Sequence, residues 1–148
     1  MVKIVQLRKD CGMSKKLSRS QARCEAFKII FQLNQHMDDV DFLLDNLMNE
    51  LPASVSSMGY IKDVVFGVMD KYDELIGIIG ENLAEGWKPE RISKVARAVL
   101  LLAIYEIKYV EDVPEKVAIN EALELAKKFD MPDSSSFVNG VLAGVVNK

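Results

Sequence analysis

The amino-acid sequence predicts an all-α protein, a compact bundle of about six or seven helices. Apolar residues recur every three or four positions along most of the chain, as they do on the buried face of an amphipathic helix. No segment shows the sustained alternation of apolar and polar residues, with turn dipeptides, that is typical of β-hairpins. The chain has 148 residues and 49% apolar side chains, which is enough to bury the core of one domain.

The most apolar stretch, residues 92–110, predicts a buried central helix. Its apolar side chains cover the whole circumference, which is typical of a helix enclosed on all sides. Glu106 lies on the stripe that we expect to be most buried. A carboxylate in that position needs either a hydrogen-bonding partner or an opening to the surface.

Three helical segments precede the central helix. The first is expected from an N-cap at about residue 18 or 20 to residue 35, and the second over residues 38–51. A third stretch over residues 56–85 is either one kinked helix or two. Pro52 closes the second segment and Gly86 the third, because both residue types interrupt helices.

Two more helices are expected after the central one. Residues 114–129 form the first, with a proline suited to its opening turn. Asp133 then stands where the N-cap of the last helix is expected, and periodicity alone places Phe137 on the buried face of that helix. Gly140 and Gly144 form a pair of small residues one turn apart, which we expect to permit close helix packing.

Charge is distributed unevenly along the chain, although the net charge is only −3. Residues 1–35 carry eight Lys or Arg side chains against two acidic ones, and a basic arm on an acidic body indicates a site for a polyanion. We expect residues 1–17 to form a basic, flexible extension and residues 18–148 a single helical domain; the alternative for the extension is a merely solubilising tail. Arg19 and Arg23 place two cations at one spot near a helix N-terminus, where they oppose the helix dipole, so a role beyond helix stability is expected.

Residues for catalysis or metal binding are scarce. The only histidine is His36, which excludes histidine dyads and histidine-based metal clusters. The chain also lacks glycine-rich phosphate loops and Cys-x-x-Cys motifs. We therefore expect no enzyme, no catalytic residue, no metal and no cofactor.

Compartment is predicted from the cysteines and the hydropathy pattern. Cys11 and Cys24 are expected to be reduced thiols of an intracellular protein. The longest wholly apolar run, residues 98–105, is far shorter than the roughly 20 residues that cross a membrane. The N-terminus does not resemble a signal peptide. A cytoplasmic protein without membrane contact is expected.

A long C-terminal segment carries a family resemblance. Residues 117–142, VAINEALELAKKFDMPDSSSFVNGVL, resemble the C-terminal signature of the NusB family of bacterial transcription antitermination factors. Residues 87–106, which begin with Trp87 and end in Leu-Ala-Ile-Tyr-Glu, resemble the middle motif of that family, and residues 22–32 resemble its first helix more loosely. The resemblance extends over roughly residues 18–142.

The resemblance implies a function and a set of binding residues. It implies an all-α fold of two packed subbundles that binds the boxA segment of nascent RNA together with the ribosomal protein NusE, within an antitermination complex of RNA polymerase. Phe31 and Glu106 match positions that face NusE, so we expect the apolar stripe to reach the surface at Glu106. The residues expected to bind RNA are Lys15, Lys16, Arg19, Arg23, Asp133, Ser134 and Phe137.

Two alternatives remain open from the sequence. The first is a helical protein-interaction module or homodimer whose RNA site has decayed, suggested by Leu101 and by the face that carries Gly140 and Gly144. The second is the NusB-like RNA-binding domain related to ribosomal RNA cytosine methyltransferases. The chain of 148 residues leaves no room for the methyltransferase domain itself.

Overall fold

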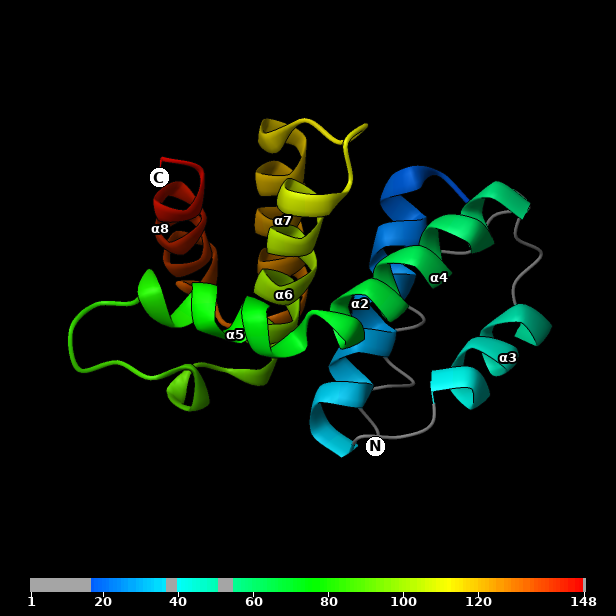
Figure 1. Ribbon diagram of the computed structural model, residues 1–148, viewed down its shortest axis with the longest axis horizontal. Helices are drawn as coiled ribbons and strands as arrows, with labels where there is room; N and C mark the ends of the chain where they lie inside the picture. Colours follow the sequence, from blue (N-terminus) through cyan, green and yellow to red (C-terminus); the bar gives the residue numbers. More distant parts are fainter. Residues whose placement is uncertain (1–16, 37–39, 51–54, 148) are drawn as a thin grey trace. The chain divides into compact units, whose positions relative to one another are not determined.

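The fold is all-α, as predicted. The computed structural model describes residues 17–36, 40–50 and 55–147. These residues form seven α-helices and one short 3-10 helix, and no strand is present among them (Figure 1). The chain divides into two compact units, Met1–Gly67 and Val68–Lys148.

The first unit contains α2 (Arg19–His36), α3 (Val40–Glu50) and most of α4 (Val55–Asp70). α2 packs against α3. A hydrogen bond of 3.2 Å from the Ser57 hydroxyl to the carbonyl oxygen of Leu17 connects α4 to the residues before α2. The buried apolar side chains of this unit include Ala22, Ala26, Phe27, Ile30, Leu33, Leu43, Leu44, Leu47, Ile61, Val64 and Val65.

Ser18 is the N-cap of α2. The backbone N–H of Gln21 donates to the Ser18 hydroxyl at 3.0 Å, and the backbone N–H of Ser18 donates to Oε1 of Gln21 at 2.9 Å. This reciprocal pair is a capping box, which satisfies backbone donors that have no partner within the helix. The start of the first helix is therefore predicted correctly.

The long segment after α3 forms two helices rather than one kinked helix. α4 starts at Val55, slightly before the predicted position, and α5 (Tyr72–Glu81) follows after a break at Lys71. α5 ends well before Gly86, because the Asn82 side-chain amide donates to the Ile78 carbonyl at 2.8 Å and satisfies a carbonyl of the last turn. Gly86 instead has a φ of 87°, a conformation that favours glycine, in the turn after the helix.

The second unit contains α5, the 3-10 helix η1 (Pro89–Arg91), α6 (Lys94–Tyr109), α7 (Glu115–Phe129) and α8 (Ser134–Val146). α6, α7 and α8 lie side by side and each contacts the other two, while α5 runs crosswise to them and packs on α6 (Figure 1). α6 is the predicted central helix. Its buried residues are Ala96, Ala98, Val99, Leu100, Leu101, Leu102, Ala103, Ile104 and Glu106.

Gly144 allows α8 to approach the end of α5 closely. A Cβ atom built on Gly144 would collide with Oδ1 of Asn82 and lie 3.2 Å from its Cγ. A Cβ on Gly140 would meet no atom within 4 Å. The prediction of close packing at the two glycines therefore holds for Gly144 only.

Two expectations about compartment have structural outcomes. Cys24 is buried and disulfide-bonded, so the expectation of a reduced thiol is wrong for this residue. Cys11 lies outside the described residues. No helix in the described part of the chain has the length and apolar character needed to cross a membrane.

Candidate nucleic-acid interface

A pocket of about 270 Å³ opens in the second unit where α6 and α8 begin. One wall comes from the residues that lead into α6, and the opposite wall comes from the first turn of α8. The lining residues are Trp87, Arg91, Ile92, Ser93, Ala96, Asp130, Met131, Asp133, Ser134 and Phe137. We call this cavity the first pocket. It combines aromatic and aliphatic side chains with one cation and two carboxylates.

Asp130 holds the two walls of the first pocket together. Its Oδ2 accepts hydrogen bonds from the hydroxyls of Ser93 at 2.6 Å and Ser134 at 2.7 Å, and its Oδ1 accepts one from the Met131 N–H at 2.8 Å. Ser93 is also the N-cap of α6, because its hydroxyl accepts from the Ala96 N–H at 3.0 Å. Asp130 therefore links the end of α7 to the starts of both α6 and α8.

Trp87 and Phe137 form an aromatic pair at the rim of the first pocket. Their ring centroids lie 6.1 Å apart with an interplanar angle of 34°. Trp87 is 53% exposed and Phe137 is half-buried. Phe137 is thus not the core residue that periodicity alone indicates. The pair presents aromatic surface on which a planar ligand can stack.

Asp133 and Ser134 have different roles from those that their helix position suggests. Asp133 precedes α8, but its side chain makes no capping hydrogen bond, so the N-cap interpretation is wrong in that respect. Its carboxylate is exposed at the pocket. Ser134 is 8% exposed and donates to Asp130. Of these two neighbours, only Asp133 is available to a ligand, and Ser134 positions the helix.

Arg19 and Arg23 of the first unit both lie over the ring of Tyr60. The guanidinium carbon of Arg19 is 4.4 Å from the ring centroid, and that of Arg23 is 5.8 Å away. The two cations are therefore brought to one spot, as their spacing predicts. Arg19 is exposed, but Arg23 is only 3% exposed, so it is poorly placed to touch a phosphate. Lys15 and Lys16 lie outside the described residues.

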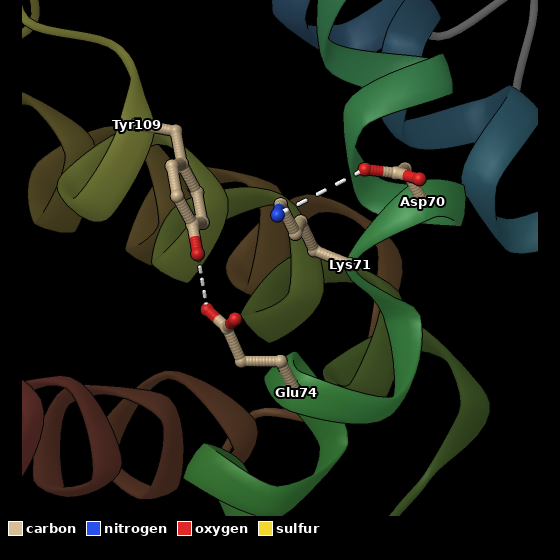
Figure 2. A network of polar contacts seen from close by, with 4 residues as sticks. All are labelled: Asp70, Lys71, Glu74 and Tyr109. Carbon is tan, nitrogen blue, oxygen red and sulfur yellow. Dashed lines mark hydrogen bonds and ion pairs between the residues drawn. The ribbon is translucent and has the colours of Figure 1, made fainter.

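A second polar cluster surrounds the break between α4 and α5 (Figure 2). The Tyr109 hydroxyl donates to Oε2 of Glu74, and Lys71 forms an ion pair of 4.0 Å with Asp70 (Figure 2). The Lys71 ammonium also lies 5.5 Å from the centroid of the Tyr109 ring. The hydrogen bond to Glu74 is the main cause that raises the pKa of Tyr109 above its ordinary value of 10.0. This cluster connects the end of α6 to the start of α5.

Comparison with known proteins identifies the family. The family model described as "NusB family" matches residues 20–147. The chain belongs to the NusB family. Membership agrees with the expectation that this chain is a binding protein rather than an enzyme.

Individual NusB relatives match along nearly their whole length. The chain is 42% identical over 130 residues to a transcription antitermination protein NusB from Acetivibrio thermocellus, covering 88% of this chain and 89% of that protein. The solved structure of T. maritima NusB is 30% identical, with a TM-score of 0.83, and covers 90% of this chain and 93% of its own. The NusB chain in a complex of antitermination factors NusB and NusE with double-stranded RNA is 22% identical, with a TM-score of 0.79 over 87% of this chain and 96% of its own, and shows the shared fold.

The two residues that we expected to face NusE are both buried in this chain. Phe31 is 4% exposed, and its ring centroid lies 6.2 Å from that of Phe27. Glu106 is completely buried, so the expectation that the apolar stripe reaches the surface there is wrong. Glu106 is the last buried residue of α6, whereas Lys108 and Tyr109 at the end of the helix are exposed. The assignment of both residues to the NusE surface stays a prediction, now without the exposure that a direct contact needs.

Three features of this NusB-family site were not predicted from the sequence. Asp130 was not singled out, although its position four residues before Ser134 is a spacing that allows local hydrogen bonding. Trp87 stands out in the sequence only as the first residue of the middle motif, and its pairing with Phe137 depends on tertiary packing. Tyr60 carried no sequence signal, because its approach to Arg19 depends on how α2 and α4 lie within the first unit.

Proposed function

We propose that this chain is a transcription antitermination factor that binds unpaired RNA bases at the first pocket and acts together with the ribosomal protein NusE. The observation that carries this proposal is the pair of exposed Trp87 and half-buried Phe137 next to the exposed carboxylate of Asp133. An aromatic face stacks on any base, and a carboxylate accepts hydrogen bonds from base amino groups. Membership of the NusB family supports the same function.

Phe137 supplies the stacking surface for a base, and Asp133 contacts the edge of that base. Arg91, which also lines the pocket and is exposed, supplies a cation for a neighbouring phosphate. Arg19 provides a further phosphate contact from the first unit, and we assign additional phosphate contacts to Lys15 and Lys16. Electrostatic contacts of this kind make binding weaker as the salt concentration rises.

The partner proposal rests on the family. A NusB chain of the same fold occurs in a complex with NusE and RNA, which supports an equivalent assembly for this chain and a role in an antitermination complex of RNA polymerase. That complex contains double-stranded RNA, whereas the pocket and its aromatic pair favour an unpaired base. A factor that acts on nascent bacterial RNA works in the cytoplasm, and we propose that compartment.

The test is a titration of fluorescein-labelled boxA RNA with the full chain, followed by fluorescence anisotropy, with and without NusE. We expect NusE to increase the affinity and added salt to reduce it. The same RNA annealed into a duplex should bind more weakly than the single strand. If boxA RNA fails to bind both with and without NusE, the proposed function is wrong.

A pair of phenylalanine variants tests the site within that titration. Phe137→Ala removes the stacking face and should weaken binding by about tenfold, because one stacked base contributes roughly 1 to 3 kcal/mol. Phe42→Ala is the matched control, since Phe42 on α3 is 60% exposed but lies outside the pocket. If the two variants bound RNA with equal affinity, Phe137 would not be part of the RNA site.

The homodimer alternative loses the features that suggested it. Leu101 is completely buried, and Gly144 packs against Asn82 within the same chain. Gly140 is exposed, but a single glycine does not make a self-complementary face. We therefore do not propose a dimer at this surface.

A further inference from the structure

A second pocket is also lined by the Trp87–Phe137 pair. It has a volume of about 330 Å³ and opens between the end of α5 and the outer side of α8. Trp87 and Phe137 line both this second pocket and the first pocket, so the aromatic pair is a wall that the two cavities share. The proposed function uses only the first of these cavities.

The lining of the second pocket is neutral. Its aliphatic part comes from Leu83, Ala84 and Val141, and its polar groups are the amide of Asn82 and the hydroxyl of Ser136. Asn82 is held in place, because its amide nitrogen donates to the Ile78 carbonyl at 2.8 Å. The first pocket, by contrast, contains Arg91 and two carboxylates. A neutral pocket with an aromatic wall suits an uncharged planar group rather than a phosphate.

We infer that the second pocket binds a second RNA base, so that an unpaired strand crosses the Trp87–Phe137 pair with one base on each side. This inference rests on the proposed function, because it takes the strand that binds the first pocket as the occupant. The two cavities share a wall, so one strand that fills the first pocket has its next bases within reach of the second. Only single-stranded RNA can spread two bases in this way, since the bases of a duplex remain stacked and paired. Trp87 then recognises RNA alongside Phe137.

Gly140 offers a way to close the second pocket alone. It lines this cavity but not the first pocket, and a Cβ there meets no atom within 4 Å. Gly140→Leu therefore places a side chain at the second pocket from a Cβ position that has free space, and leucine favours a helix more than glycine does. Gly77→Leu is the matched control, because Gly77 is an exposed glycine of α5 with the same free space and lines neither pocket.

The experiment compares these variants in the anisotropy titration with single-stranded boxA RNA. Gly140→Leu should weaken binding by about tenfold and Gly77→Leu should not. Trp87→Ala should weaken binding at least as much as Gly140→Leu, and Trp87→Phe should restore most of the affinity. If Gly140→Leu binds RNA as tightly as Gly77→Leu, the second base site is wrong although the proposed function stands. If the unmodified chain binds no RNA, both are wrong.

A base-specific readout uses RNA that carries 2-aminopurine at one position at a time. When the RNA binds the unmodified chain, 2-aminopurine at two positions should change in fluorescence because the base stacks on an aromatic ring. With Gly140→Leu, the change should remain at only one of these positions. Trp87 is the only tryptophan of the chain, so its own fluorescence reports binding at the shared wall. If only one RNA position responded when the RNA binds the unmodified chain, the inference would be wrong. The inference would also be wrong if Gly140→Leu weakened the binding of NusE and left the binding of RNA unchanged, because the pocket would then be a protein-binding site.

Discussion

The hydroxyl of Ser93 donates a hydrogen bond of 2.6 Å to Oδ2 of Asp130, which stands 37 residues further along the chain. Ser134 donates to the same oxygen. One carboxylate therefore holds the residue before α6 to the first residue of α8, and the first pocket opens between them. The placement of Phe137 on α8 depends on this link.

Asp130→Ala should lower the free energy of unfolding by about 1 to 3 kcal/mol, because it leaves the Ser134 hydroxyl, which is largely buried, without its acceptor. Urea denaturation followed by circular dichroism measures this change. Asp133→Ala is the control. Its side chain is exposed and makes no capping bond, so the loss should stay within about 0.5 kcal/mol. Equal losses in the two variants would contradict the structural role of Asp130.

Gly144→Ala should make the protein less stable than Gly140→Ala by about 1 kcal/mol. The new methyl group at residue 144 displaces the Asn82 side chain and breaks its hydrogen bond to the Ile78 carbonyl, whereas the methyl group at residue 140 has free space. Both variants gain the same helix propensity, so the comparison isolates the contact. Thermal denaturation measures the difference. Adding Asn82→Ala to both variants should abolish it, and a difference that persists would place the strain elsewhere.

Arg19→Ala and Arg23→Ala should separate RNA binding from stability. Arg19 is exposed, so its removal should reduce the slope of log affinity against log salt by about one contact, with a stability loss of about 0.5 to 1 kcal/mol from its contact with Tyr60. Arg23 is buried, so its removal should cost about 1 to 3 kcal/mol of stability with little effect on the slope. Titrations at several salt concentrations and urea denaturation provide the two measurements. A change of slope confined to Arg23→Ala would reverse these roles.

Much of the fold is predictable because helix formation depends on residues that are close together in the sequence. The capping box at Ser18, the buried face of α2 and the apolar circumference of α6 all follow from residues within a few turns of one another. Helix ends are harder. α5 ends at Glu81 because the Asn82 side chain caps it, and the sequence alone made Gly86 the stronger stop signal.

The site is less predictable because it depends on contacts between helices. The family resemblance selected Phe137 and Asp133, and both line the first pocket. It could not select Trp87 as the partner of Phe137, since 50 positions separate them and only packing brings their rings together. For Glu106, by contrast, the resemblance selected a residue that the structure does not expose. The resemblance implied a partner-facing role for Glu106, but the side chain is completely buried, because burial is set by everything packed around a residue.

The hydrogen bond between Tyr109 and Glu74 should make stability fall at alkaline pH. It raises the pKa of Tyr109, with smaller contributions from desolvation and from the charges of Glu74, Tyr105 and Asp70. Below the ordinary tyrosine value of 10.0, the phenol is protonated in both the folded and the unfolded chain, so its contribution is fully present. As the pH rises above that value, Tyr109 of the unfolded chain loses its proton first, and the contribution is lost by the time the folded phenol ionises.

Glu74→Gln removes the charged acceptor, so the free energy of unfolding of this variant should decline less steeply over the same pH range. Urea denaturation at a series of pH values measures the decline. In a Tyr109→Phe background, Glu74→Gln should no longer change the pH dependence. If Glu74→Gln in the unmodified chain left the pH dependence of stability unchanged, this hydrogen bond would not be the cause of that dependence.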